Sequence, residues 1–203
     1  VKIHEATEVT EFNINQDKVT SVTCESGTFE FDQIVLAAGS WSGLLSKALK
    51  ISLPMQAGKG YSFTVENIEK NIRIPSIFLE ARVAVTPMGN NLRFGGTMEI
   101  VGVDERINMN RVQGIVDSIP HYYPEMKFKT PAIDKIWHGL RPCSPDGLPY
   151  IGRSRVYKNL IYATGHAMMG LSLAPATGKL VSELVNDQQT TIPIQAFNPE
   201  RFN

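Results

Sequence analysis

Alternating hydrophobic and polar positions near the start of the chain predict short β-strands. The run "KVTSVTC", residues 18–24, is rich in β-branched residues, and "TFEF", residues 28–31, places Phe29 and Phe31 on one face. The residues "ESG" between these runs favour a tight turn. We therefore expect the first 31 residues to form a small group of strands joined by turns.

A continuous hydrophobic run, "IVLAA" at residues 34–38, shows no polar alternation. Such a run is typical of a strand that is buried on both faces in a layered sheet. Gly39 ends this strand, and Ser40 or Ser42 is a candidate cap for the short helix "SGLLSKAL". A second short buried strand is predicted at residues 160–163.

The pattern changes after Leu53. Three segments predict strands of a second sheet, "GYSFTVEN", "SIFLEARVAVTP" and "NNLRFGGTM", with residues 88–91 as a hairpin loop. A helix is predicted from about residue 110 to residue 119, and Pro120 is expected to stop it. We place domain boundaries near Leu53 and near Trp137. The apolar stripe of the helix consists of Val112, Ile115, Val116 and Ile119.

The last helix is predicted from small and apolar residues that recur at steps of three and four. A turn bounded by glycines, residues 165–170, precedes it. Pro175 is expected in the first turn of the helix, where a missing N–H costs no hydrogen bond. The stripe consists of Leu171, Ala174, Gly178, Val181 and Val185.

Composition narrows the classes of function. Twenty basic and twenty acidic residues give a formal net charge of zero, and a nucleic-acid partner would need a basic excess. The chain has no apolar run long enough to span a bilayer, and no apolar signal segment is visible at its start. Since the two cysteines and four histidines are scattered, we expect no metal site. Few cysteines and the lack of a visible export signal favour a reducing, cytoplasmic location.

The turn at residues 165–170 is the first candidate for chemistry. The helix that follows presents unpaired N–H groups and partial positive charge, which suit an anion. A strand–turn–helix connection whose small residues only permit tight packing gives the same pattern. His166 has no carboxylate partner nearby in the sequence, which favours a structural histidine.

Arg141 is the second candidate. Pro142 favours an extended backbone at Arg141, and the turn "PDG" at residues 145–147 fixes the loop beyond it. An arginine held in this way can bind a carboxylate through two parallel hydrogen bonds. A structural ion pair with Asp146 or another acid is an equally good interpretation of these residues.

Two glycine-containing segments complete the set. Gly39 would let a ligand approach the backbone at the carboxyl end of the first buried strand. The segment "QAGKGYSF" carries Lys59, which is either a ligand-binding residue or a solvated loop lysine. The dinucleotide fingerprint G-x-G-x-x-G is absent from the chain.

Four stretches, taken in order, resemble the FAD-dependent amine oxidoreductases that include D-amino-acid dehydrogenase, glycine oxidase and sarcosine oxidase. They are "IVLAAGSWS", "GKGYS", "WHGLRPCSPDGLPYIG" and "NLIYATGHAMMGLSLAPATGKLVSEL", and the ending "FNPERF" fits as well. The resemblance covers nearly the whole chain and is closest to the bacterial D-amino-acid dehydrogenases. It implies an α/β (α+β) fold. Residues 1–52 and 137–203 would form the C-terminal part of a FAD-binding α/β domain, and residues 53–136 an antiparallel-sheet substrate domain.

The resemblance also implies a reaction, the oxidative deamination of an amino acid of D configuration by hydride transfer from the α-carbon to flavin N5. Arg141 would be the catalytic residue that binds the substrate carboxylate. Met98, Ala84 and Met168 would line an apolar substrate pocket, although Met98 and Ala84 are equally compatible with core packing. N–H groups at the start of the last helix would stabilise negative charge on the reduced flavin. The implied cofactor-binding residues are Ala38, Gly39, Trp41, Lys59, Gly165, His166, Met169, Gly170, Leu171 and Ser172.

Members of this family begin with a strand–GxGxxG–helix unit, so the chain resembles the C-terminal half of a longer enzyme. We expect the chain by itself to bind FAD weakly or not at all and to be inactive. The alternatives are a glycine- or sarcosine-type amine oxidase, and a non-catalytic subunit or binding module that retains the fold. Oxygen or a quinone of the respiratory chain would accept the electrons, and a quinone would place the protein at the inner face of the membrane.

Overall fold

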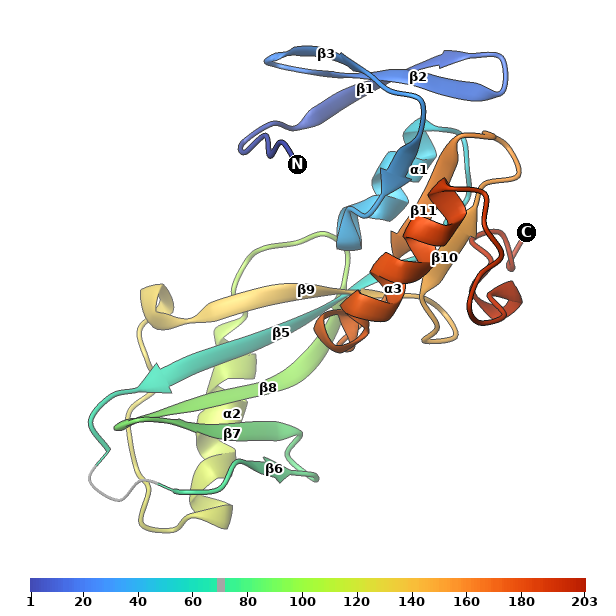
Figure 1. Cartoon of the computed structure of the whole chain (residues 1–203). Coiled ribbons are helices and arrows are strands. Elements are labelled where there is room, and N and C mark those ends of the chain that lie inside the picture. Colours follow the sequence, from blue (N-terminus) through green and yellow to red (C-terminus); the bar gives the residue numbers. More distant parts are fainter. Residues whose placement is uncertain (69–71) are drawn as a thin grey trace. The chain divides into compact units, whose positions relative to one another are not determined.

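The computed structural model describes residues 1–68 and 72–203, and it has a mixed α/β fold (Figure 1). Its internal contacts divide the chain into two compact units. Unit 1 contains Val1–Gln56 and Pro142–Asn203, and unit 2 contains Ala57–Arg141. The sequence places the two boundaries near Leu53 and Trp137, a few residues before those of the structure.

Unit 1 begins with an antiparallel sheet of three short strands. Their order is β1 (Val9–Asn15), β2 (Lys18–Cys24) and β3 (Gly27–Glu30), which confirms the two strands predicted in this region. The side-chain amide of Asn159 donates to the carbonyl of Val19 at 2.7 Å and accepts from its N–H at 3.0 Å. A residue from the C-terminal part of the chain therefore holds the middle strand.

The second sheet of unit 1 has the order β10 (Tyr150–Arg153), β11 (Leu160–Thr164) and β4 (Ile34–Leu36). β11 is parallel to β4 and antiparallel to β10. β11 is buried along most of its length, as predicted. The expectation that β4 is buried on both faces is wrong for the described residues, because β4 is an edge strand and its Val35 is 37% exposed.

Helix α1 (Ser42–Ala48) follows a 3-10 turn, Gly39–Trp41. No side chain caps either element, so the expectation that Ser40 or Ser42 is a cap is wrong. The 3-10 turn leads directly into the helix, and Ser42 already has helical backbone angles. Its hydroxyl donates instead to Thr164 Oγ1 of β11, at 2.9 Å.

Unit 2 is a sheet of five strands that a helix covers on one face (Figure 1). The pairings of β6 with β7, β7 with β8 and β8 with β5 are antiparallel. Met88 pairs with Asn91 across a two-residue turn, which confirms the predicted hairpin. In spatial order the strands are β6 (Ser76–Phe78), β7 (Val83–Met88), β8 (Asn91–Val101), β5 (Gln56–Val65) and β9 (Trp137–Cys143).

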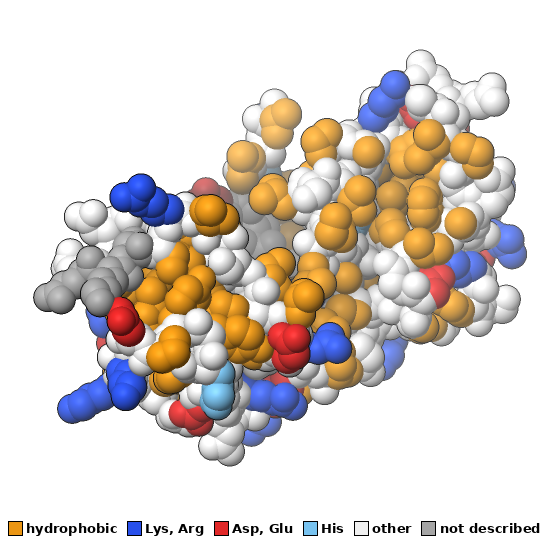
Figure 2. Space-filling model, turned by 90° about the horizontal axis from the view of Figure 1, so that it is seen from below, with side chains coloured by type: hydrophobic (Ala, Val, Ile, Leu, Met, Phe, Trp, Pro, Cys, Tyr) orange, Lys and Arg blue, Asp and Glu red, His pale blue; other side chains and the backbone are white. Residues whose placement is uncertain are grey.

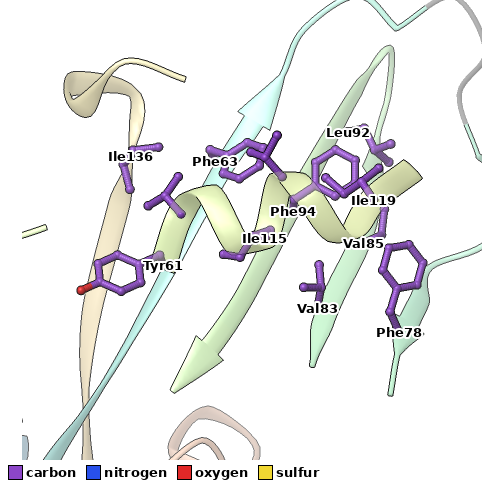
Figure 3. Close-up of a cluster of buried hydrophobic side chains, with 12 residues drawn as sticks. Tyr61, Phe63, Phe78, Val83, Val85, Leu92, Phe94, Ile115, Ile119 and Ile136 are labelled. Carbon is purple, nitrogen blue, oxygen red and sulfur yellow. The ribbon is translucent and has the colours of Figure 1, made fainter. Parts of the chain in front are cut away.

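Helix α2 (Met109–Tyr122) lies on this sheet through the predicted apolar stripe, all of which is buried. Figure 3 shows side chains of α2 and of strands β5 to β8 meeting in one cluster, with Phe94 at its centre. The expectation that Pro120 stops the helix is wrong, because α2 continues to Tyr122. Pro120 costs only the bond from its own missing N–H, and Tyr123 N still donates to Ile119 O at 2.9 Å.

Helix α3 (Gly170–Val185) packs against β10 and β11 in unit 1. Leu180 and Glu183 are buried, whereas Leu171 of the predicted stripe is 91% exposed. The stripe is therefore not the face that α3 buries in the described chain, because the buried residues of the helix, Leu180 and Glu183, are not members of it. The sequence predicts Pro175 in the first turn of the last helix. This expectation is wrong, because Pro175 lies in the second turn of α3.

Hydrophobic side chains also reach the surface of each unit (Figure 2). They include Trp41 and Leu44 in unit 1 and Ile77 and Ile100 in unit 2. Within residues 1–68 and 72–203, no helix combines the length and the hydropathy needed to cross a bilayer. Two further 3-10 turns are formed by Ile133–Lys135 and Gln195–Phe197.

Candidate active site

The carboxyl ends of the parallel strands β4 and β11 lie at the same edge of the unit 1 sheet. Gly39 follows β4 and Gly165 follows β11. The hydroxyl of Thr164 accepts from Ser42 Oγ at 2.9 Å and donates to the carbonyl of Gly39 at 3.2 Å. The two glycine segments that the sequence assigns to the cofactor therefore begin side by side.

The turn after β4 is open above its backbone. Gly39 has φ +53°, which favours glycine, and no described atom comes within 4 Å of a Cβ added there. Ala38 directly precedes Gly39 and is partly exposed, and Trp41 is 43% exposed. Ala38, Gly39 and Trp41 thus leave space for a ligand beside the main chain.

The glycine-bounded turn before α3 is held by contacts within unit 1. Gly165 has φ +80°, and a Cβ added there would lie 2.9 Å from Tyr150 Cδ2. Both the backbone and the available space therefore favour glycine. The N–H of Ala167 donates to the carbonyl of Pro142 at 2.9 Å, so the segment that follows Arg141 forms one wall of this turn.

The side chain of His166 is engaged inside unit 1. Its Nε2 lies 2.9 Å from Thr177 Oγ1 of α3, and its backbone forms an isolated bridge with Cys143. Burial lowers the pKa of the imidazole, which favours the neutral ring at pH 7. These contacts fit the structural interpretation of His166, and its role in cofactor binding stays a prediction.

The N-terminus of α3 offers N–H groups to a ligand. Met169 occupies the N-cap position, and no side chain caps the helix there. The first N–H groups of a helix have no intrahelical partner, and the helix dipole makes this end positive. Met168 and Met169 are 70% and 53% exposed. The predicted donors Gly170, Leu171 and Ser172 therefore lie at an accessible, uncapped helix end.

In unit 2, two substrate-binding candidates lie on the face of the sheet opposite α2, which we call the open face. Ala84 lies between the buried Val83 and Val85 on β7, and it is exposed. Met98 of β8 is 49% exposed. Because both side chains reach the surface of the described chain, the interpretation that they are core-packing residues is wrong there.

Arg141 lies on β9, the neighbour of β5 in the same sheet. Its Nη1 donates to the carbonyl of Thr97 at 3.4 Å. A Cβ added at Gly60 would lie 2.6 Å from the Cζ of Arg141, and closer still to both terminal nitrogens. The guanidinium therefore lies over Gly60, on the open face.

Asp146, the acid that the sequence suggests as a partner for Arg141, is bound by a different arginine. Arg201 donates to Asp146 Oδ2 from Nε at 2.8 Å and to Oδ1 from Nη2 at 2.7 Å. These hydrogen bonds hold the pKa of Asp146 far below its usual range. Both carboxylate oxygens of Asp146 are thus engaged by Arg201, and the role of Arg141 in binding a substrate carboxylate stays a prediction.

Lys59 is buried, with 1% exposure, on the α2 face of β5. Its Nζ donates to the carbonyls of Asp104 at 3.0 Å and Arg106 at 2.6 Å, and it lies 4.0 Å from Glu99 Oε2. Glu99 also accepts from Tyr61 Oη at 2.6 Å, and this bond lowers the pKa of Glu99. Burial raises the pKa of Tyr61 to about 12. The interpretation of Lys59 as a solvated loop lysine is wrong, and its role at a cofactor stays a prediction.

Sequence reasoning missed two residues beside Arg141. Gly60 carries a signal that could have found it, because a glycine inside a strand often marks a close approach of another group. Thr97 has φ +63°, and no sequence pattern indicates that conformation for a β-branched residue. The partner of Asp146, Arg201, was also missed, since the two residues lie far apart in the sequence.

Comparisons with known proteins bear on the class of enzyme. The family model described as "DAO: FAD dependent oxidoreductase" matches residues 1–184. The chain is 34% identical, over 95% of its length, to the D-amino-acid oxidase of Bradyrhizobium diazoefficiens. It is 34% identical, over 92% of its length, to the D-amino acid dehydrogenase of Granulibacter bethesdensis. These matches cover 46% and 44% of the two relatives, so the chain spans about half their length.

Among solved structures, the glycine oxidase from Geobacillus kaustophilus matches with a TM-score of 0.83 at 27% identity. The match covers 98% of this chain and 53% of that one. The chain therefore belongs to the family of FAD dependent oxidoreductases, whose cofactor is FAD. The family and the α/β (α+β) fold class predicted from the sequence are both confirmed.

Proposed function

We propose that the protein is an oxidoreductase that uses FAD to deaminate a D-amino acid oxidatively. The observation that carries this proposal is the guanidinium of Arg141, which lies on the open face of the unit 2 sheet and donates to the carbonyl of Thr97. A planar guanidinium suits bidentate binding of a carboxylate. The curated relatives named above act on D-amino acids by their names, which supports an amino acid as the substrate.

Unit 1 would hold the cofactor. The N–H groups of Gly170, Leu171 and Ser172 would bind the part of the flavin that becomes negative on reduction, and the uncapped end of α3 fits that role. Ala38, Gly39 and Trp41 would lie along the ring system. When bound, FAD supplies the hydride acceptor that turns the amine of the substrate into an imine.

The chain has no G-x-G-x-x-G fingerprint of its own. We therefore propose that an N-terminal half with such a unit, outside this chain, holds the pyrophosphate of FAD. The electron acceptor would be oxygen or a quinone of the respiratory chain. With a quinone, we place the protein in the cytoplasm at the inner face of the membrane.

Arg141 would bind the substrate carboxylate and so fix which face of the α-carbon meets the oxidant. Met98 and Ala84 of the open face would line the site of the substrate side chain, and the predicted substrate-binding role of Met168 before α3 stays a prediction. Their apolar character favours an apolar side chain. His166 would contribute its backbone, because its ring is already engaged with Thr177.

A glycine-type amine oxidase is the second candidate function, because the solved glycine oxidase matches the fold at 27% identity. A substrate panel separates the two. The full-length protein is mixed with FAD and then with D-amino acids, L-amino acids, glycine or sarcosine, and bleaching of the flavin absorbance is followed. Bleaching by glycine and sarcosine alone would replace the first proposal with the second.

Substitution of Arg141 tests the carboxylate-binding role. Loss of one partner of a buried charged pair costs about 3–5 kcal/mol, so we expect Arg141→Ala to lower kcat/KM by roughly two to four orders of magnitude. Arg141→Lys keeps the positive charge but loses the paired N–H donors of the planar guanidinium, so it should recover only part of the activity. Flavin content and melting temperature should stay unchanged.

The matched control is Arg93→Ala. Arg93 lies on β8, where its Nη2 donates to Ser62 Oγ at 2.8 Å and its guanidinium carbon lies 5.7 Å from the centre of the Trp137 ring. We expect its loss to change kcat/KM only a few-fold, since these partners are local. A stable, flavin-replete Arg141→Ala protein with undiminished kcat/KM would end the carboxylate-binding hypothesis.

A further inference from the structure

Gly60 stands in the middle of β5, where a glycine weakens a strand. The backbone does not require it. The glycines with positive φ in the described chain, among them Gly39 and Gly165, do not include Gly60. A requirement for glycine at this position must therefore come from what lies beside it.

The space left by the absent side chain is filled by Arg141. The Cζ of its guanidinium lies 2.6 Å from the position that a Cβ of residue 60 would occupy, well inside van der Waals contact. No main-chain atom is among the three atoms closest to that position. Any side chain at position 60 therefore competes directly with the guanidinium, which is the mobile end of a long side chain.

A β-bulge opposite Gly60 supplies the second contact. Lys59 pairs with Glu99 and Tyr61 pairs with Gly96, so two residues of β8 face Gly60 alone. One of them is Thr97, whose φ of +63° is rare and costly for a β-branched residue. Within the described chain, Thr97 Oγ1 is buried and makes no hydrogen bond.

The strained residue Thr97 contacts Arg141 through its main chain. The carbonyl of Thr97 accepts a hydrogen bond from Arg141 Nη1 at 3.4 Å. The N–H of Thr97 donates to the carbonyl of Arg82 at 3.3 Å, which anchors the bulge to the start of β7. Strain of this kind persists only where the surroundings over-determine it, and it is concentrated at functional sites.

Polar contacts on the α2 face of the sheet fix the residues on either side of the bulge. Glu99 follows the bulge, and its carboxylate accepts from Tyr61 Oη at 2.6 Å and from Asn108 Nδ2 at 2.9 Å. Lys59 precedes Gly60 and is tied to the carbonyls of Asp104 and Arg106. Lys59 and Glu99, which lie on either side of the space that the guanidinium of Arg141 fills, are therefore fixed by polar contacts.

We propose that Gly60 and Thr97 are positioning residues that set the specificity for substrates with an α-carboxylate. Because Gly60 has no side chain, the guanidinium of Arg141 can occupy the space beside it. The carbonyl of Thr97 orients this guanidinium for bidentate binding of the substrate carboxylate. This inference rests on the proposed function. It adds that the selectivity for amino acids over plain amines depends on a missing side chain on β5, the strand between β8 and β9.

Gly60→Ala in the full-length holoenzyme tests the inference. Restoring a normal contact of about 3.5 Å to the new Cβ displaces the guanidinium by roughly 1 Å. A misplacement of about 1 Å can cost on the order of 100-fold, so we expect kcat/KM for the best amino acid to fall about 100-fold, mainly through KM. The melting temperature should stay within about 2 °C of the parent protein, because only a flexible side-chain end must move.

Gly95→Ala is the matched control on the open face. A Cβ added at Gly95 would meet Ser62 Cβ at 3.5 Å and the carbonyl of Tyr61 at 3.8 Å, both ordinary contacts. It would not meet Arg141 within 4 Å. We expect kcat/KM of this variant to stay within about threefold of the parent, since surface changes of this kind cost little.

A double-mutant cycle shows whether Gly60 acts through Arg141. In an Arg141→Lys protein the planar fork is gone, and the effect of Gly60→Ala on kcat/KM should shrink from about 100-fold to less than about tenfold. A merely structural role of Gly60 would leave the effect equally large in both backgrounds.

The outcomes separate this inference from the proposed function. If no amino acid bleaches the flavin of the parent protein, the proposed function fails, and the inference fails with it. If the parent is active and Gly60→Ala behaves like Gly95→Ala, or if its effect is independent of residue 141, the inference alone is overturned.

Discussion

On β5 of unit 2, Lys59 and Tyr61 point toward α2, whereas Gly60 between them points to the open face. The α2 face is closed by aromatic and aliphatic side chains (Figure 3) and by the polar contacts of Lys59 and Glu99. The open face carries the exposed Ala84 and Met98 and the guanidinium of Arg141. Because side chains alternate along a strand, one sheet can hold its fold with one set of residues and leave the other set to bind a ligand.

This division predicts that substitutions on the two faces affect different properties. Changes on the α2 face should lower the free energy of unfolding and leave the properties of the surviving folded protein intact. Changes at Arg141 and Gly60 on the open face should lower kcat/KM and leave stability intact, whereas the control changes at Gly95 and Arg93 should have little effect on kcat/KM. Three substitutions test the first half of this statement, from the largest expected effect to the smallest.

The largest effect is expected for Phe94→Ala. Phe94 is fully buried at the centre of the unit 2 core, so its truncation should lower the free energy of unfolding by about 3–5 kcal/mol. Ile77→Ala is the control, because Ile77 is 67% exposed on the open face and its loss should cost less than about 0.5 kcal/mol. Urea unfolding measures both, and equal costs would contradict the division between the faces.

An intermediate effect is expected for Lys59→Met. The substitution removes two charge-assisted hydrogen bonds and one of the cations near Glu99, which should cost roughly 1.5–3 kcal/mol. If Lys59 acts only in the fold, the flavin content of the folded fraction should not change. Lys129→Met, at an exposed position of unit 2, should be neutral. Loss of flavin with no loss of stability would instead support the predicted role of Lys59 at the cofactor.

The smallest effect is expected for Tyr61→Phe, which removes the hydrogen bond to Glu99 and should cost about 1 kcal/mol near neutral pH. The folded protein raises the pKa of Tyr61 to about 12, above its ordinary value of about 10. Because the pKa is higher in the folded state, protonated Tyr61 contributes its full stabilisation to the fold below about pH 10. This contribution to the free energy of unfolding is lost as the pH rises through about 12.

The difference in stability between the parent protein and Tyr61→Phe should therefore be constant from pH 7 to about 9 and should shrink above about pH 10. Tyr150 and Tyr162 also have pKa values raised to about 12, but they are present in both proteins and cancel in the difference. A difference that grows with pH would contradict this assignment.

The elements that local patterns determine were predictable from the sequence. The β7–β8 hairpin and the buried stripe of α2 follow from periodicity and turn residues within a short window. The burial of β4 and the orientation of α3 were mispredicted, because burial depends on which elements pack against them. An apolar pattern reports that a face is suited to burial, and it does not report what covers that face.

The candidate site shows the same limit. Arg141 could be singled out because Pro142 and the turn at residues 145–147 follow it closely in the sequence. The burial of Lys59 could not, since the carbonyls that bind it belong to a distant loop, residues 104–106. The conformation of Thr97 could not either, because it results from the pairing of β8 with two neighbouring strands.

Unit 1 is interrupted in the sequence by unit 2, and this order has a consequence for biosynthesis. Ile34 of β4 must wait for its parallel partner Leu160 of β11 until the ribosome has made all of unit 2. Unit 2 contains every strand neighbour of β6, β7 and β8, so it can complete most of its own pairings first. During this interval the hydrophobic segment at residues 34–38 lacks its parallel partner strand in the nascent chain, and exposed segments of this kind favour aggregation.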